Sequence, residues 1–357
     1  MTASVGAGHE LPAQALAVQF AREVPDSDIV IEDGLDHLGP LVAWVSHGAP
    51  RVVFFRSEWI WDAGFWLFAR FPLTRWLSKT TLYRAEHARL RALVDRTRPD
   101  VIISTWPITT EVLARMRRRR EISVPVVATI TDISALEYWA APGVDLHLIS
   151  YPDSAPEVRH IAGPATRVVC VHGMTRPEFL SPRTRAEARA TLALPDDGAI
   201  VLVSGGGWGV GDVSGAVDVA LAVPEVRMVV CLCGRNDDLA DVLRRRLGDD
   251  RRVRIEDFTD GISDYMAAAN ALVHSTGGNT IIEAHMRGCT PISYGWGRGH
   301  IRLHNRAFRE YGIAEVVATE DELAGAIRRA VAIERVPDVS FAHLPSAASA
   351  VMELIGR

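Results

Sequence analysis

The sequence predicts an α/β protein of two Rossmann-like domains, each with a parallel sheet, facing a central cleft. Short apolar runs alternate with helical stretches along the chain, which is typical of parallel sheets covered by helices on both faces. The length of 357 residues suits two domains of ordinary size. A segment with two prolines and mixed charge, residues 172–188, indicates a linker between the halves.

The strand candidates are short runs rich in β-branched residues. In the first half they are Asp28–Ile31, Arg51–Phe55, Asp100–Ser104, Pro125–Ile130, Asp145–Ser150 and Arg167–Val171. In the second half they are Ala199–Ser204, Val226–Leu232, Arg252–Glu256, Ala271–His274, Thr290–Tyr294 and Ala314–Val317. We therefore expect an N-terminal domain over residues 1–175 and a C-terminal domain over 184–357, and we allow for the last helix packing back on the N-terminal domain.

The start of the chain is unusual for this fold. Only the five residues MTASV precede the glycine loop GAGH, so a strand of the usual length, about five or six residues, would have to begin at the first residue. We expect either that the coding start lies upstream or that the first strand is unusually short.

Composition narrows the class of protein. The chain is 48% hydrophobic and 23% charged, and its net charge of −5 predicts no general attraction to nucleic acid. Its four cysteines form no zinc-binding spacing, so we expect reduced thiols in a cytoplasmic protein. We also expect no membrane-spanning helix, signal peptide, metal or cofactor.

Two glycine-rich loops follow strand candidates of the second half, where open α/β sheets bind ligands. GGGWGVGD, residues 205–212, matches neither the dinucleotide-binding pattern nor the P-loop. Clustered backbone N–H groups before a helix still suit anionic oxygens, although a flexible turn is the alternative. STGGNT, residues 275–280, repeats the design and adds hydroxyl groups. Glu283 follows it, where a helix-capping role competes with ligand binding.

Two amide-rich loops suit a diphosphate, and a nearby carboxylate suits ribose hydroxyls. The second half therefore predicts a site for a nucleotide-sugar.

Six motifs carry a resemblance over nearly the whole chain: TASVGAGH (2–9), PDVIIST (99–105), TDISALEYW (131–139), GMTRPEFL (173–180), VLVSGGGWG (201–209) and STGGNTIIEA (275–284). In this order and spacing the sequence resembles the GT-B glycosyltransferases related to monogalactosyldiacylglycerol synthases, processive diacylglycerol glucosyltransferases and the N-acetylglucosaminyltransferase that forms lipid II. The resemblance implies a UDP-sugar on the C-terminal domain and the acceptor mainly on the N-terminal domain.

The resemblance also implies roles for residues of the donor site. The diphosphate lies against Gly206, Gly207, Gly277, Gly278 and Thr280, while Glu283 binds the ribose and Phe258 lies beside the uracil. The other expected donor-side residues are Ser275, Thr276, Asn279, His300 and Asn305.

His9 is the expected catalytic base, because an imidazole with a pKa of about 6.5 can accept a proton from an attacking hydroxyl. Asp132 is expected to support the base or bind the acceptor, and an N-cap is its alternative role. The expected acceptor-binding residues are Gly8, Trp61, Trp66, Trp106 and Trp139.

Two positions of the first half depart from the family pattern, and His300 of the second half departs as well. Trp106 stands where relatives commonly have histidine in STHP, and Leu136 stands where they commonly have another histidine. At His300 relatives have glutamine followed by an acidic residue, so the sequence does not predict which sugar is transferred.

The function predicted from the sequence is inverting, metal-independent transfer of a hexose from a UDP-sugar to a hydroxyl of a lipid or another apolar acceptor. The alternatives are a UDP-N-acetylglucosamine 2-epimerase-like enzyme, glycosylation of a small secondary metabolite, and a non-enzymatic nucleotide-sugar sensor. Residues 59–76 combine many aromatic side chains with arginines, which suits a surface that enters the headgroup layer. This segment predicts peripheral binding to the inner face of the membrane, with an aromatic lid as the alternative.

Overall fold

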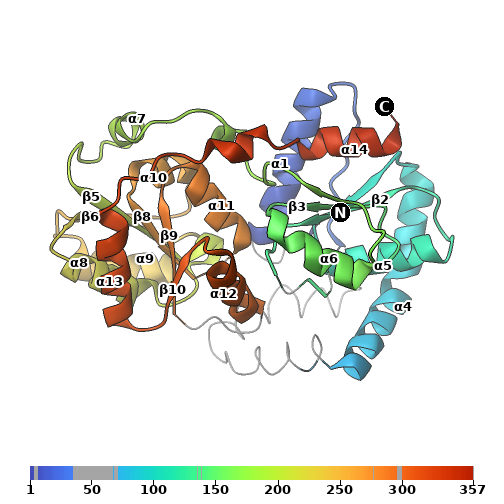
Figure 1. Cartoon of the computed structure of the whole chain (residues 1–357), viewed down its shortest axis with the longest axis horizontal. Helices are drawn as coiled ribbons and strands as arrows, with labels where there is room; N and C mark the ends of the chain where they lie inside the picture. The colour runs from blue at the N-terminus through green and yellow to red at the C-terminus, as the bar shows by residue number, and fades with distance from the viewer. Residues whose placement is uncertain are drawn as a thin grey trace. The chain divides into compact units, whose positions relative to one another are not determined.

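The structure is a computed structural model that describes residues 1–3, 7–34, 67, 71–134, 136–137, 139–275, 277–295 and 300–356. The chain divides into two compact units. The first comprises Met1–Arg176, Arg298–Leu303 and Ala342–Arg357, and the second comprises Pro177–Gly297 and His304–Phe341. Each unit contains one parallel sheet with helices packed on it (Figure 1), which confirms the predicted fold class.

The sheet of the first unit has the strand order β1-β2-β3-β4, and its neighbouring strands are all parallel. Its strands are β1 (Ile102–Ser104), β2 (Val126–Ile130), β3 (Leu146–Ile149) and β4 (Val168–Cys170). Its helices are α1 (Ala7–Glu23), α4 (Pro72–Thr97), α5 (Pro107–Arg118), η3 (Pro152–Ser154), α6 (Ala155–Ala162) and α14 (Ala347–Ile355). The central strands β2 and β3 are buried along their whole length, as their apolar sequences require.

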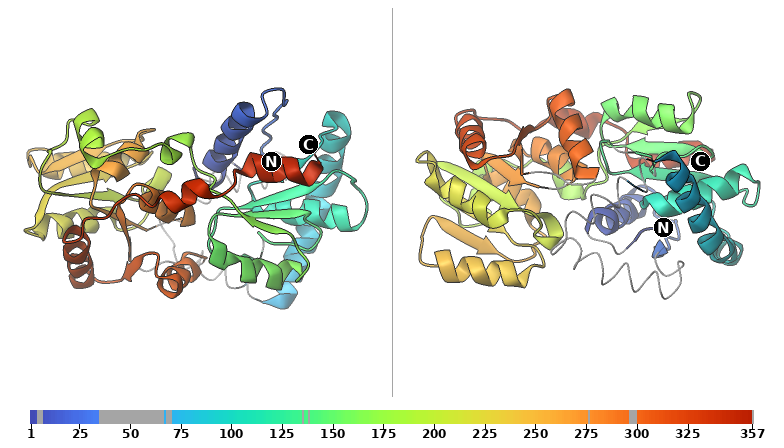
Figure 2. Two further views of the ribbon diagram at one scale, coloured as in Figure 1. Left: turned by 45° about the horizontal axis from the view of Figure 1, so that its top comes forward. Right: turned by 90° about the horizontal axis from the view of Figure 1, so that it is seen from below.

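The last helix, α14, lies beside α1 within the first unit (Figure 2). Leu16 and Phe20 of α1 share a buried cluster with Ala347 and Val351 of α14 and with Leu148 of β3. The C-terminal helix therefore covers the sheet that carries the N-terminal motifs.

The chain start forms only a trace of a strand. The Thr105 N–H donates to the Met1 carbonyl at 2.9 Å, and Thr2 pairs with Asp33 in a single parallel bridge. The strand predicted over Asp28–Ile31 is wrong, because these residues form no strand, and the bridge that the described residues form in this region lies two residues later, at Asp33. The candidate Arg51–Phe55 lies outside the described residues.

The sheet of the second unit has the strand order β10-β9-β8-β5-β6-β7. The strands are β5 (Ala199–Ser204), β6 (Val226–Leu232), β7 (Val253–Glu256), β8 (Ala271–His274), β9 (Thr290–Tyr294) and β10 (Glu315–Val317). The chain builds outward from β5 through β6 to β7, then returns to place β8 on the other side of β5. The strand order thus reverses between β5 and β8, which is where open α/β sheets bind ligands.

Helices pack on this second sheet. They are η4 (Pro177–Leu180), α7 (Arg185–Thr191), η5 (Gly206–Trp208), α8 (Val213–Ala222), α9 (Asp237–Leu247), α10 (Ile262–Ala268), α11 (Gly278–Met286), most of α12 (His300–Tyr311) and α13 (Glu320–Val331). η6 (Val339–His343) leads back to the first unit. Among the helices that the structure describes, none combines the length and apolar character needed to cross a membrane.

A buried arginine ties the starts of β5 and β8 together. Arg189 donates to the carbonyls of Ala268, Asp196 and Gly198, each at 3.0 Å, and to Asn270 Oδ1 at 3.1 Å. The same Asn270 oxygen accepts from the Ile200 N–H at 3.0 Å. Because these bonds saturate groups at the amino ends of both strands, they fix the register of the two strands whose opposite ends carry the glycine loops.

Candidate active site

The two predicted glycine-rich loops lie at the carboxyl ends of adjacent strands and touch. Ser275, directly after β8, donates its hydroxyl to the Val210 carbonyl at 2.7 Å. A Cβ atom on Gly211 would lie 2.3 Å from the Ser275 oxygen, and Gly211 also has φ +90°. Only glycine satisfies both conditions at position 211. The contact brings the loops together at the point where strand order reverses.

The loop after β5 is a tight turn. Gly206 has φ +71° and begins η5, and a Cβ atom on Gly205 would lie 2.5 Å from the Val210 nitrogen. The Gly206 N–H donates to Ser204 Oγ at 3.2 Å, and the Gly207 carbonyl accepts from the Arg235 N–H at 2.9 Å. The turn therefore holds its glycines in one conformation, supported by groups from β5 and from the loop after β6.

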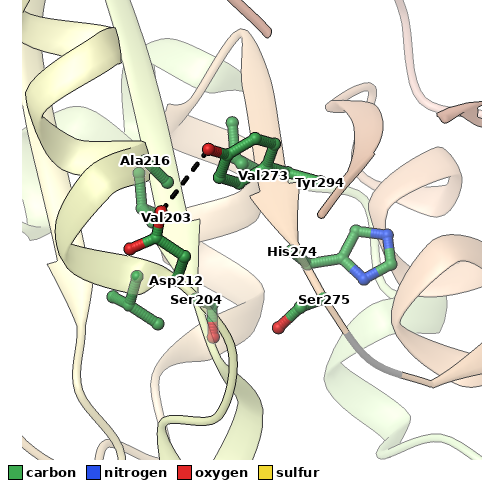
Figure 3. Close-up of a pocket in the computed structure, with 9 residues that line it drawn as sticks. Val203, Ser204, Asp212, Ala216, Val273, His274, Ser275 and Tyr294 are labelled. Atoms are coloured by element: carbon green, nitrogen blue, oxygen red, sulfur yellow. Dashed lines mark hydrogen bonds between the residues drawn. The ribbon is translucent and has the colours of Figure 1, made fainter. Parts of the chain in front are cut away.

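A small cavity lies among the ends of β5, β8 and β9 (Figure 3). Its volume is about 10 Å³, roughly the space of one water molecule. Tyr294 and Asp212 point toward one another there, with the phenol donating to Asp212 Oδ2 at 3.4 Å. Asp212 also caps α8 by accepting from the Gly215 N–H at 2.9 Å. Burial, followed by the charge of Asp212, raises the pKa of Tyr294, so the phenol remains a donor.

The loop after β8 leads straight into α11. Gly277 occupies the N-cap position with φ +58° and ψ +133°, and no side chain caps the helix. The helix-capping role considered for Glu283 is therefore wrong, because Glu283 lies in the second turn of a helix whose N-cap has no side chain. Gly277 is exposed, while Asn279, Thr280 and Glu283 are half-buried. Thr276 lies outside the described residues.

The remaining donor-side predictions lie after β7 and on α12. Phe258 follows β7, and the Arg235 guanidinium lies 4.1 Å from the centre of its ring. Asn305 of α12 is buried and accepts from Ser293 Oγ at 2.7 Å, which joins α12 to β9. The structure does not describe the side chain of His300. Arg235 was not predicted from the sequence, although it lies in CGRN (residues 233–236), a third loop at the same edge of the sheet, after β6.

The first unit brings His9, Trp139 and Asp132 together. His9 lies in the first turn of α1, and its Nδ1 is 3.0 Å from the Thr105 carbonyl oxygen, just beyond β1. The His9 and Trp139 rings are 5.4 Å apart between centroids. Trp139 Nε1 donates to Asp132 Oδ2 at 2.8 Å, just beyond β2. Asp132 therefore accepts a hydrogen bond from Trp139, the side chain whose ring lies beside His9.

The hydrogen bond at Nδ1 decides which nitrogen of His9 can act as a base. A carbonyl oxygen only accepts, so the neutral ring carries its proton on Nδ1 and leaves the Nε2 lone pair available. Burial lowers the pKa of His9, whereas the Asp132 carboxylate and the bond to Thr105 raise it. The net lowering keeps the ring neutral at neutral pH, which is the form a general base requires.

The other acceptor-side predictions have varied environments. Trp106 is only 5% exposed and packs with Ala3, Leu82 and Ile108, which favours a packing role over acceptor contact. A Cβ atom on Gly8 would meet nothing within 4 Å, so space is open beside it. Trp61 and Trp66 lie outside the described residues.

Sequence comparison finds a matching family model and several similar proteins. The family model described as monogalactosyldiacylglycerol (MGDG) synthase matches residues 9–174. A processive diacylglycerol beta-glucosyltransferase of Bacillus cytotoxicus is 22% identical over 327 residues, covering 90% of this chain and 82% of that protein. The corresponding protein of Staphylococcus carnosus is 24% identical over 240 residues, covering 66% of this chain and 60% of its own length.

Solved structures show the same fold. MurG of Acinetobacter baumannii is 14% identical with a TM-score of 0.53, covering 77% of this chain and 78% of that chain. UGT89C1 of Arabidopsis thaliana, complexed with UDP, is 14% identical with a TM-score of 0.58, covering 99% of this chain and 97% of that chain. The resemblance read from the motifs is confirmed, and the fold is that of the GT-B glycosyltransferases.

The environment of His9 predicts its titration. We expect His9 to titrate below the ordinary value of about 6.5 in NMR spectra of ring-labelled protein. Asp132→Asn should lower the His9 pKa further, because it removes the charge that favours the imidazolium form. Asp153→Asn, at an exposed acid of the same unit, serves as the control and should leave the His9 titration in place. A His9 pKa that rises in Asp132→Asn would contradict this electrostatic assignment.

Proposed function

We propose that the protein is an inverting glycosyltransferase that moves a hexose from a UDP-sugar to a hydroxyl of a diacylglycerol-type lipid. The observation that carries the proposal is His9, whose Nδ1 is occupied by Thr105 and whose Nε2 is left to act as a base. The diacylglycerol glucosyltransferases that align with most of this chain support the same reaction class.

In this proposal the second unit binds the donor. The paired loops and the uncapped start of α11 offer backbone N–H groups to the diphosphate, at a helix end whose dipole favours negative charge. The complexes with UDP among proteins of this fold support that choice of nucleotide. Glu283, half-buried in the second turn of α11, accepts from the ribose hydroxyls in this proposal.

The chemical step is a direct displacement. His9 Nε2 takes the proton of the acceptor hydroxyl as its oxygen forms a bond to the anomeric carbon of the sugar. The bond from that carbon to the diphosphate oxygen breaks, and UDP leaves with the electron pair. One displacement inverts the anomeric configuration. Backbone dipoles stabilise the negative charge that develops on the leaving diphosphate, while the Asp132 carboxylate favours the imidazolium that forms at His9.

The amino end of α4 supports an apolar acceptor. Leu73, Trp76 and Leu77 are 75%, 63% and 56% exposed, and their spacing places them on one face of the helix. Phe71, the N-cap residue, is 59% exposed beside them. We call these four residues the α4 apolar face. A contiguous apolar surface of this kind is typical of a binding site for another apolar partner.

The proposed reaction is tested with UDP-sugars labelled in the hexose and a lipid extract containing diacylglycerol. Wild-type protein should move label into the lipid phase, and His9→Ala should retain UDP binding while transfer falls by about 10²-fold or more. An altered UDP-sugar without transfer would indicate an epimerase, and unchanged UDP-sugar would indicate a sensor. Label on a water-soluble acceptor would replace the lipid with a small metabolite. Near-normal turnover by His9→Ala would remove His9 from the mechanism.

Glu283 tests the donor half separately. Glu283→Ala should weaken UDP binding by about tenfold or more in titration calorimetry, because hydrogen bonds to a charged acceptor contribute about 1.5–3 kcal/mol. The protein should stay folded, since Glu283 caps no helix. Glu322→Ala is the matched control, because Glu322 is a capping-box residue on the exposed start of α13. Unchanged UDP affinity in a folded Glu283→Ala protein would exclude the ribose contact.

The α4 apolar face predicts weak, reversible binding to vesicles, since the net charge of −5 adds no attraction to anionic lipid. Changing Leu73, Trp76 and Leu77 together to serine should reduce co-sedimentation with phosphatidylcholine vesicles containing diacylglycerol. The control is the same change at Ile333, Val336 and Val339, which are 57%, 79% and 66% exposed in the second unit. Wild-type protein that never sediments, or a control that loses binding equally, would contradict a lipid-binding role for this face.

A further inference from the structure

Arg235 occupies an unusual position in the loop after β6. Its N–H donates to the Gly207 carbonyl at 2.9 Å, so its backbone is attached to the turn after β5. Its guanidinium extends the other way and lies 4.1 Å from the centre of the Phe258 ring, in the loop after β7. A single residue therefore connects the diphosphate loop of the proposed donor site with the aromatic residue at its far end.

The guanidinium has donors to spare. Two arginines of the adjacent helix α9 are neutralised, Arg244 by Asp257 at 2.7 Å and Arg246 by Asp218 at 2.8 Å. Arg235 is exposed, and no carboxylate in the parts of the chain that the structure describes forms an ion pair with it. An aromatic ring fixes the orientation of the flat group without consuming its N–H donors. The stack thus presents an oriented set of donors at the edge of the sheet.

The position of this stack separates it from the diphosphate. β7 is two strands away from β5, about 10 Å at the usual strand spacing. A UDP-sugar held by its diphosphate at the β5–β8 reversal has two ends, the hexose on one side and the ribose with its base on the other. A guanidinium held flat against an aromatic ring presents its N–H donors in one plane, which matches the in-plane acceptors of a base better than the hydroxyls of a hexose ring. The base is therefore the end that suits the Arg235 fork.

We infer that Arg235 determines base specificity, by stacking on Phe258 and donating hydrogen bonds to the carbonyl oxygens of a pyrimidine base. The inference rests on the proposed function, because it concerns the same donor nucleotide. Uracil presents carbonyl acceptors, which match a guanidinium that can only donate. Adenine has no carbonyl oxygen, and its exocyclic amino group is a donor, so it offers a guanidinium only ring-nitrogen acceptors. Arg235 should therefore favour UDP over ADP, although both carry the same diphosphate.

The test is the ratio of affinities for UDP and ADP, measured by titration calorimetry on the full chain. Wild-type protein should prefer UDP. Arg235→Met keeps an unbranched apolar stem against Phe258 and removes the donors, so UDP affinity should fall about tenfold or more while ADP affinity changes far less. Arg235→Lys keeps the charge but not the flat fork, and its ratio should also fall.

Arg246→Met is the matched control, because it removes one exposed arginine of the neighbouring helix without touching Phe258. Its ratio should equal that of wild type. Equal weakening of UDP and ADP in Arg235→Met, restored for both by Arg235→Lys, would assign Arg235 to the phosphates and overturn the inference. An unchanged ratio in both Arg235 variants would also overturn it. Wild-type protein that binds neither nucleotide would overturn the proposed function as well, so the two failures are distinguishable.

Discussion

The contact between Gly211 and Ser275 is the constraint on which the glycine loops of the second unit depend. Parallel strands end at one edge of a sheet, so loops after β5 and β8 meet wherever those strands are neighbours. At 2.7 Å from Ser275 Oγ to the Val210 carbonyl, nothing larger than glycine fits at position 211. Arg189 and Asn270 hold the opposite ends of the same two strands, so the loops are fixed from both sides. The groups proposed to bind a diphosphate are thereby positioned before any ligand arrives.

The first unit uses the same principle for a different purpose. Thr105 and Asp132 stand just beyond the ends of β1 and β2, which are paired in register. One supplies a carbonyl that orients His9, and the other supplies a charge that Trp139 holds in place. A buried imidazole without these groups would have an even lower pKa and an undefined tautomer. The sheet therefore sets both the direction and the basicity of the proposed base.

The sequence predicted the strands buried on both faces better than it predicted edges and side-chain partners. β5, β6, β8 and β9 begin and end at the predicted residues, because continuous apolar runs between turn residues have few other ways to be buried. Asp28–Ile31 has a similar composition, but among the described residues this region pairs only through the bridge between Thr2 and Asp33. The composition of a segment does not indicate whether another strand is available to pair with it. The capping alternative for Glu283 failed for a related reason, since it depended on which residue begins α11. Arg235 was not predicted because a single arginine in a loop carries no sequence signal, and its partner Phe258 is known only from the structure.

The two departures from the family pattern acquire a physical meaning in this structure. Trp106 is 5% exposed and Leu136 is fully buried, where it packs with Trp139. Both side chains pack in the buried part of the first unit, so their apolar character suits the packing around the proposed site. Leu136 packs against the indole whose Nε1 binds Asp132 at 2.8 Å. A polar residue at 136 would need its own buried partner and would compete for that carboxylate. The apolar residue leaves Asp132 engaged with Trp139, and within the described part of the chain Asp132 is the charged group that raises the pKa of the proposed base, His9.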